Sequence, residues 1–274
     1  MSSRSDPTLY RETRGSGEPV VLLHGWGMNL RIFDGLRDAL AVEHQVIAID
    51  LPGHGRSGWQ AHASAQHQLD WLAASLPRAA TLVGWSLGGQ LALQLAAQTD
   101  LALRRLVLIA SSPRFVTGDD WPHGLPAATL QRFAEQLAVD PDRTVADFLE
   151  LQVRGSVAAP AMLLRLQRAL RDHGNARPDA LQAGLALLQH NDLRALARAI
   201  RLPVLVIAGQ YDRVTQPQAS QALVQLLADA RLLLVRRAGH APFLSHAQEV
   251  AARLLDFIRP GAQRFAVRAA PGRR

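Results

Sequence analysis

Short apolar runs alternate with amphipathic segments in the first and last parts of the chain. Buried strands are short apolar runs bounded by turn residues, whereas helices repeat apolar residues every three or four positions. The strands that this pattern predicts are residues 8–14, 20–23, 45–50, 79–83, 106–110, 203–208 and 232–235, and the helices are 87–99 and 248–258. Strands that alternate with helices indicate an α/β fold, with a mostly parallel central sheet flanked by helices.

The pattern changes in the middle of the chain. Residues 113–199 predict amphipathic helices and no convincing strand. Open α/β sheets bind ligands at the carboxyl ends of their strands, so a helical block inserted between two strands predicts a cap over that edge. We therefore expect a core of residues 1–112 and 200–260, a helical cap of residues 113–199, and a basic, disordered tail of residues 261–274.

The pentapeptide Gly84-Trp85-Ser86-Leu87-Gly88 joins a predicted strand to a predicted helix. G-x-S-x-G in that position is the nucleophile elbow of α/β hydrolases. Gly84 and Gly88 lack Cβ atoms, so strand and helix can approach each other while Ser86 is held in a strained conformation at the turn. A plain Gly/Ser turn would explain the pentapeptide equally well, so the other site residues decide between the two interpretations.

Two polar residues follow predicted strands near the end of the chain. Asp212 comes after strand 203–208, and His240 comes after strand 232–235. Taken singly, they are better explained as a turn carboxylate and a loop histidine. The order Ser86, Asp212, His240 is, however, the chain order of an α/β-hydrolase triad, and all three follow strands that end at one edge of the sheet. The sequence therefore predicts a Ser-His-Asp catalytic triad.

Two other residues compete for places in this triad. Asp192 is a second carboxylate before the late strands, but we expect it to be a helix N-cap at the end of the cap. His246 lies towards the closing helix rather than directly after a strand. Asp212 and His240 are therefore preferred.

An acyl-transfer site also needs backbone N–H groups that hold the oxyanion. The N–H of Leu87, directly after the nucleophile, supplies one donor, and hydrolases of this fold take the second from the loop after an earlier strand. That loop is His24-Gly25-Trp26-Gly27. We predict that the Trp26 N–H is the second donor and that His24 holds the loop by hydrogen bonds.

A glycine-rich loop raises the alternative of a dinucleotide site. Gly53, Gly55 and Gly58 satisfy G-x-G-x-x-G after a strand. The dinucleotide pattern opens a helix directly and places an acidic residue at the end of the next strand, whereas Asp70 falls inside a predicted helix here. The chain also has no cysteine and no H-E-x-x-H run, so we expect neither a cofactor nor a metal.

Charge and hydropathy limit the partners. The net charge of +7 lies entirely in residues 201–274, which hold 11 arginines and 4 carboxylates, and much of it falls in the tail. This distribution gives little support for nucleic-acid binding. No window reaches the roughly 18 unbroken apolar residues of a membrane span, and the first residues lack a signal-peptide stretch. We expect a cytoplasmic protein that binds no membrane.

Several motifs together resemble one family. They are His24-Gly25-Trp26-Gly27-Met28-Asn29, Gly84-Trp85-Ser86-Leu87-Gly88-Gly89, Ala110-Ser111-Ser112-Pro113, Asp120-Trp121-Pro122, Arg143-Thr144-Val145 with Phe148-Leu149, and Gly239-His240-Ala241-Pro242-Phe243. They are similar to the pimeloyl-[acyl-carrier protein] methyl ester esterases of biotin synthesis. That resemblance implies a serine carboxylesterase with Ser86, Asp212 and His240 as catalytic residues. It also implies that Trp26 and Leu87 lie at the oxyanion and that Phe148 faces the acyl chain.

The same resemblance implies a partner, the acyl carrier protein that carries the ester. The family meets this acidic protein with cap arginines, of which only Arg143 falls within a matching motif here. Arg165, Arg168 and Arg171 share the polar face of a predicted cap helix. Two other functions stay open: a broad-specificity carboxylesterase or thioesterase for small acyl esters, and a ligand-binding protein that has kept the hydrolase fold. An intact triad argues against the second.

Overall fold

The computed structural model describes residues 6–259, and the predicted tail of residues 261–274 lies outside them. The described residues form a seven-stranded sheet in the order β1-β3-β2-β4-β5-β6-β7. Its strands are β1 (Arg11–Arg14), β2 (Pro19–Leu23), β3 (Gln45–Ile49), β4 (Thr81–Trp85), β5 (Arg105–Ile109), β6 (Val204–Gly209) and β7 (Ala230–Val235). Only β1 runs antiparallel to its neighbour. The mostly parallel α/β sheet predicted from the sequence is confirmed.

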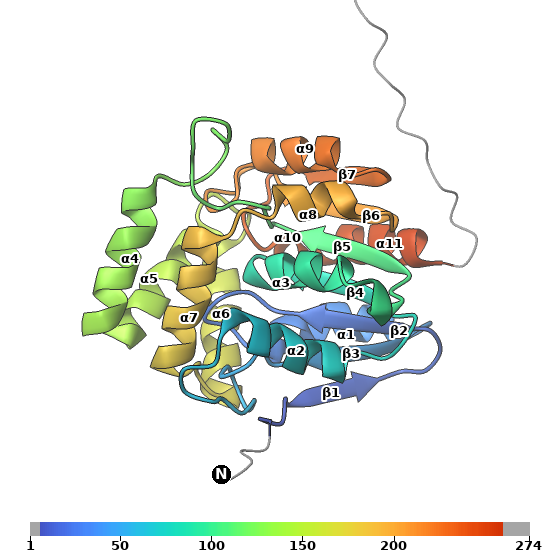
Figure 1. Cartoon of the computed structure of the whole chain (residues 1–274), viewed down its shortest axis with the longest axis horizontal. Helices are drawn as coiled ribbons and strands as arrows, with labels where there is room; N and C mark the ends of the chain where they lie inside the picture. The colour runs from blue at the N-terminus through green and yellow to red at the C-terminus, as the bar shows by residue number, and fades with distance from the viewer. Residues whose placement is uncertain (1–5, 260–274) are drawn as a thin grey trace, which may run out of the picture.

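Helices cover both faces of the sheet (Figure 1). They are α1 (Asp34–Leu40), α2 (Ala65–Ser75), α3 (Leu87–Ala96), α8 (Arg194–Ala199), α9 (Pro217–Leu226), α10 (Pro242–Ser245) and α11 (Ala247–Ile258), with the 3-10 helices η1 (Leu30–Phe33) and η2 (Thr99–Leu101). One apolar cluster joins the sheet to α2, α3, α8 and α9, and a second joins it to α1, α10 and α11. Burial on both faces explains why the central strands are continuous apolar runs.

Four more helices lie between β5 and β6 in the chain, beyond one end of the sheet (Figure 1). They are α4 (Ala127–Val139), α5 (Pro141–Val153), α6 (Ala159–His173) and α7 (Pro178–His190), and we call them the cap helices. The segment from 113 to 199 contains only isolated β-bridges besides its helices. Its last helix, α8, packs against α9 and α3. The exact boundaries of a separate cap stay a prediction.

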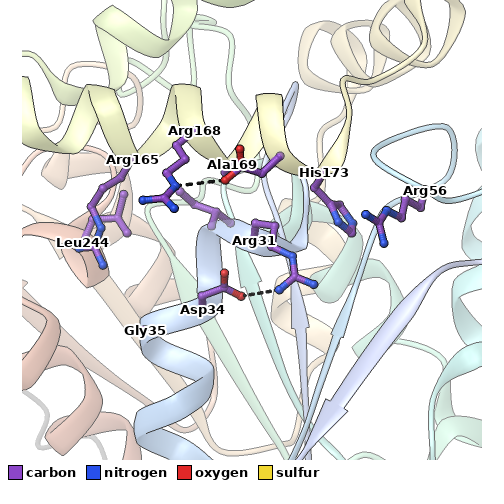
Figure 2. A pocket seen from close by; sticks show the side chains of 11 residues that line it. Arg31, Asp34, Gly35, Arg56, Arg165, Arg168, Ala169, His173 and Leu244 are labelled. Carbon is purple, nitrogen blue, oxygen red and sulfur yellow. Dashed lines mark hydrogen bonds and ion pairs between the residues drawn. The ribbon is translucent and has the colours of Figure 1, made fainter.

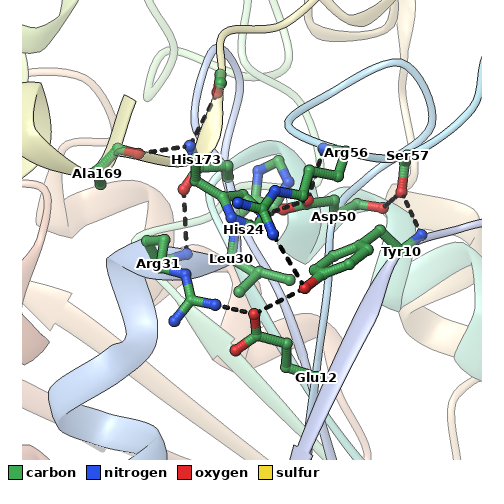
Figure 3. Close-up of polar contacts among 12 residues, drawn as sticks. Tyr10, Glu12, His24, Leu30, Arg31, Asp50, Arg56, Ser57, Ala169 and His173 are labelled. Carbon is green, nitrogen blue, oxygen red and sulfur yellow. Dashed lines mark hydrogen bonds and ion pairs between the residues drawn. The ribbon is translucent and has the colours of Figure 1, made fainter. Parts of the chain in front are cut away.

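The C-terminal end of α6 is tied to the core by buried polar contacts (Figure 3). His173 Nε2 lies 2.7 Å from Asp50 Oδ2, and both side chains are almost completely buried. The Asn29 amide donates to the carbonyl oxygens of Ala169 and Gly174 at 2.9 and 3.0 Å. One amide thus bonds both the last turn of α6 and the residue that follows the helix. The cap helices are thereby fixed to the loops that follow β2 and β3.

No helix among residues 6–259 combines the length and the apolar character that crossing a bilayer requires.

Candidate active site

Ser86 stands at a strained turn between β4 and α3. Its backbone has φ 54° and ψ −117°, a conformation that residues with a Cβ rarely adopt. The neighbouring glycines permit it, because a Cβ on Gly84 would lie 2.3 Å from the Gly88 oxygen, and one on Gly88 would lie 2.3 Å from the Leu23 oxygen. Strain held by tight surrounding packing is typical of a functional position. The turn has the geometry that G-x-S-x-G predicts.

The structure brings together the three residues predicted as a triad. His240 Nε2 lies 2.9 Å from Ser86 Oγ, and His240 Nδ1 lies 2.8 Å from Asp212 Oδ2. Ser86 and Asp212 follow β4 and β6, and His240 follows β7, so all three stand at the carboxyl edge of the sheet. The arrangement places a hydroxyl against a base and the base against an orienting carboxylate, which is the geometry of an activated nucleophile.

The Asp212 carboxylate accepts several further hydrogen bonds. Its Oδ1 accepts from the backbone N–H groups of Val214 and Thr215 at 2.8 and 2.9 Å. Its Oδ2 accepts from the Thr215 hydroxyl at 2.7 Å, beside the bond with His240. These hydrogen bonds fix the position of the carboxylate that orients the imidazole.

The loop that carries His240 is held from both the core and the cap. The Trp85 indole N–H donates to the His240 carbonyl at 2.8 Å, and the His240 N–H donates to the Gln152 carbonyl on α5 at 3.2 Å. The N–H of Gly239 donates to the hydroxyl of Ser156, just beyond α5, at 2.9 Å. The position of the imidazole therefore depends on α5 as well as on the sheet.

The site is closed in this conformation. Ser86 and His240 are each 1% exposed, and Asp212 is 4% exposed. The cap helix α7 lies directly above: a Cβ on its Gly184 would lie 2.9 Å from Trp26 Cδ1 and 3.0 Å from Leu87 Cδ2. The cap therefore covers the catalytic residues and restricts access to Ser86.

The segments that carry the two predicted oxyanion donors lie beside the nucleophile. Leu87 is the first residue of α3, where backbone N–H groups have no partner within the helix. The loop after β2 also approaches the serine, since a Cβ on Gly25 would lie 3.2 Å from Ser86 Cβ. Its next residue, Trp26, is buried, and the Trp26 indole N–H donates to the Leu181 carbonyl of α7 at 2.8 Å.

Phe148 and Arg143 both lie on α5 but in different surroundings. Phe148 is buried, and its ring meets the Trp26 indole edge to face at 5.0 Å between centroids. Arg143 is 74% exposed and pairs with Asp147, one turn along the helix, at 2.9 Å. The structure thus places Phe148 against the predicted oxyanion loop and Arg143 on the outer surface of the cap.

His24 holds its loop, as the sequence predicts. Its Nε2 accepts from the Leu51 N–H at 2.9 Å, so Nδ1 carries the proton and donates to the Gly25 carbonyl at 2.8 Å. Burial lowers the pKa of His24 well below its ordinary value, and the neighbouring His54 lowers it further. A neutral imidazole fixed at both nitrogens is a structural element.

The prediction for Asp192 is off by one position. The residue that caps α8 is Leu193, and Asp192 lies one residue before it. Its carboxylate still accepts from the Arg194 N–H at 3.2 Å, and it pairs with the Arg194 side chain at 2.6 Å. Hydrogen bonding to Arg194 lowers the pKa of Asp192. Asp192 therefore forms a surface ion pair with Arg194, two residues later in the chain.

The sequence matches the model of the alpha/beta hydrolase fold over residues 18–247. The chain belongs to the α/β-hydrolase family. It is 40% identical to a pimeloyl-[acyl-carrier protein] methyl ester esterase of Nitrosomonas europaea over 242 residues, which cover 88% of this chain and 96% of the relative. An esterase of the same description from Chromobacterium violaceum is 39% identical, over 91% of this chain and 98% of the relative. The resemblance drawn from the sequence motifs is confirmed.

Solved structures share the fold. An esterase from Exiguobacterium antarcticum has a TM-score of 0.83 and 22% identity, covering 93% of this chain and 96% of that one. A bromoperoxidase from Bacillus anthracis has a TM-score of 0.80 and 24% identity, covering 94% and 97% of the two chains. At these identities the likeness concerns the fold alone.

Sequence reasoning missed several supporting residues of this hydrolase site. Thr215 follows Asp212 by three residues, a spacing at which a hydroxyl often bonds a turn carboxylate, so a local signal existed. Trp85 and Ser111 had no such signal, because their partners, the carbonyls of His240 and Ser86, lie far away in the chain.

Proposed function

We propose that this protein is a serine carboxylesterase that hydrolyses the methyl ester of a pimeloyl group carried on acyl carrier protein, a reaction required for biotin synthesis. The observation that carries the proposal is the continuous contact from Ser86 through His240 to Asp212, in a chain that is 40% identical to a named pimeloyl-[acyl-carrier protein] methyl ester esterase. The products are methanol and the free carboxylate of the carrier-bound pimeloyl group.

In the proposed mechanism Ser86 is the nucleophile and His240 is the base. As Ser86 Oγ attacks the ester carbon, its proton passes to His240 Nε2, 2.9 Å away. Asp212 holds Nδ1–H at 2.8 Å and stabilises the imidazolium that forms. His240 then gives the proton to the departing methoxide, and methanol leaves. Water attacks the acyl-enzyme with His240 as base, which frees the carboxylate and restores Ser86.

The negative oxygen of each tetrahedral intermediate needs donors that are fixed before the reaction. We assign this role to the backbone N–H groups of Leu87 and Trp26. Leu87 begins α3, so the helix terminus adds its partial positive charge at the same place. The hydrogen bond from the Trp26 indole to Leu181 fixes the second loop from the cap side.

The cap supplies the proposed contacts with substrate. Phe148 packs on Trp26 beside the oxyanion loop, a position from which its ring can border the acyl chain. Arg143 is exposed on α5, where it pairs with Asp147 and can also meet an acidic carrier protein at the surface. Rim charges of this kind act mainly on association rate.

Methanol release from two substrates tests the proposal. One substrate is the pimeloyl methyl ester on acyl carrier protein, and the other is the methyl ester of a small soluble acid. We expect kcat/KM to be much higher for the carrier-bound ester and to be abolished for both by Ser86→Ala. Wild-type protein should also restore growth of a biotin-requiring strain that lacks its own esterase, and Ser86→Ala should not.

Other results point to the alternatives. Equal kcat/KM for the two esters would indicate a broad-specificity esterase and overturn the proposed substrate. Absence of hydrolysis by the folded wild-type protein would overturn the enzymatic assignment and favour a ligand-binding protein.

A further inference from the structure

Four arginines surround a cavity at the seam between the cap helices and the core (Figure 2). The cavity measures about 530 Å³, a size typical of small-molecule sites. Arg165 and Arg168 reach it from α6, Arg31 from η1, and Arg56 from the loop after β3. The arginines thus converge from three separate segments of the chain.

The cavity carries an excess of positive charge. Asp34 and Asp172 are the carboxylates among its lining residues, so the arginines exceed them by two. Arg168 pairs with Asp172 at 3.1 Å, and Arg31 pairs with Asp34 at 3.4 Å and with Glu12. These ion pairs use only some of the guanidinium N–H donors at the cavity, because each arginine has five.

Two of the four arginines have no carboxylate partner within residues 6–259. Arg56 lies over the Tyr10 ring and donates to its hydroxyl at 3.4 Å. Arg165 extends from the cap to the core, where a Cβ built on Gly35 would lie 3.7 Å from its Nη2. A guanidinium is always charged, so two arginines held at one cavity without counter-ions favour an anion.

We propose that this cavity binds a phosphate-bearing small molecule and thereby joins the cap to the core. Guanidinium forks match the oxygens of a phosphate and bind them through charge-assisted hydrogen bonds. A ligand held by α6 on one side and by η1 on the other bridges both parts of the protein. The concave shape and the convergence of three segments favour a small anion. A protein partner would instead meet arginines that face outward along one helix. The site is distinct from the proposed catalytic residues.

The arginines of α6 provide a matched control. Arg165 and Arg168 line this cavity, whereas Arg171, on the same helix, lines a different cavity together with α5 and α7. All three are exposed, so their replacement by glutamine leaves the core packing intact. Arg165→Gln with Arg168→Gln is the test variant, and Arg171→Gln changes charge on the same helix without touching the site.

Calorimetric titration of the full chain with pyrophosphate tests the proposal, with sodium chloride at matched ionic strength as reference. We expect saturable binding at one site, an affinity at least about tenfold weaker in the double variant, and an unchanged affinity in Arg171→Gln. Hydrogen exchange of α6 should slow in wild type when pyrophosphate is added. Hydrolysis of a small ester by the double variant should match wild type.

Two further arms separate the sources of the phosphate. Inorganic phosphate and pyrophosphate represent free anions, and ADP represents a phosphate carried on a larger molecule. Saturable binding of a free anion or of ADP supports the site, and the ligand that binds most tightly identifies the class of ligand. Absence of saturable binding by all three, or equal weakening in the double variant and Arg171→Gln, overturns it. A rise in KM for carrier-bound ester in the double variant without anion binding also overturns it, because the arginines would then dock a protein.

Discussion

His173 Nε2 and Asp50 Oδ2 lie 2.7 Å apart, and this contact joins the last turn of a cap helix to the end of β3. Asp50 is 0% exposed, and its carboxylate otherwise accepts from the N–H groups of Leu30 and Arg56 at 2.7 and 2.9 Å. Gly55 is required beside it, since a Cβ there would lie 2.4 Å from Asp50 Oδ2. The pair is therefore a structural link between cap and core, apart from the triad.

Replacing His173 should destabilise the protein. His173→Ala leaves a buried carboxylate without one of its donors, which costs about 3 kcal/mol in the free energy of unfolding. His173→Gln can still donate to Asp50 and should recover part of the loss. Urea denaturation measures both, with Asp172→Ala, at the exposed neighbouring position, as the control. An equal effect of His173→Ala and Asp172→Ala would show that the pair contributes nothing to stability.

Stability should fall with acid because of His24 and His54. Burial is the main cause that lowers the pKa of each below its ordinary value of about 6.5. The unfolded chain therefore takes up protons at a higher pH than the folded chain. The free energy of unfolding should decrease as pH falls below about 6.5, by up to about 1.4 kcal/mol per pH unit for each group, until the lowered folded pKa is reached.

His54→Asn tests the contribution of one of these groups. The asparagine amide can keep the hydrogen bond that His54 Nδ1 makes with the Pro52 carbonyl, while the buried Nε2, which has no partner among the described residues, is removed. The pH dependence of the unfolding free energy, measured between pH 5 and 8, should become shallower. An unchanged slope would mean that His54 is protonated alike in both states.

Thr215 should position the triad through Asp212. Thr215→Val removes the hydroxyl that donates to Asp212 Oδ2 at 2.7 Å but keeps the shape of the side chain. We expect kcat to fall about tenfold with KM unchanged, because a charge-assisted hydrogen bond that orients the base is lost. Thr215→Ser should restore most of the activity. Steady-state kinetics on a small ester would contradict this role if KM alone changed.

The indole N–H of Trp26 should hold the cap closed. Trp26→Phe removes the hydrogen bond from the indole to the Leu181 carbonyl, at a cost of about 0.5–1.5 kcal/mol, while an aromatic ring still packs on Phe148. Hydrogen exchange at the start of α7 should become faster. Trp59→Phe is the control, since Trp59 donates to Asp179 on the same helix where water can replace it. Equal exchange in both variants would exclude a special role for Trp26.

The local parts of the site could be predicted from the sequence. Gly84 and Gly88 stand where a Cβ atom would clash within the same turn, so the sequence alone indicates the tight turn. Asp212 and His240 each follow an apolar run that forms a strand. The predicted strands agree with the observed strands to within a few residues, although β1 begins three residues later than predicted and α3 ends three residues earlier.

Contacts between distant segments could not be predicted. The partners Trp85 and His240 are 155 residues apart, as are Trp26 and Leu181, and Asp50 and His173 are 123 apart. Such pairs depend on how the cap helices pack against the core. The periodicity of apolar residues along the chain does not predict that packing. The separation of Arg171 from Arg165 and Arg168 has the same origin, since all three share one polar face in the helical pattern.

The central claim is that Ser86 is the activated nucleophile, and covalent labelling measures this most directly. A fluorophosphonate probe reacts with a serine only where a base and an oxyanion site activate it. We predict one added group per chain in the intact mass of the wild-type protein, located on the peptide that contains Ser86, and none in Ser86→Ala. Labelling at another residue, or undiminished labelling of Ser86→Ala, would contradict the account.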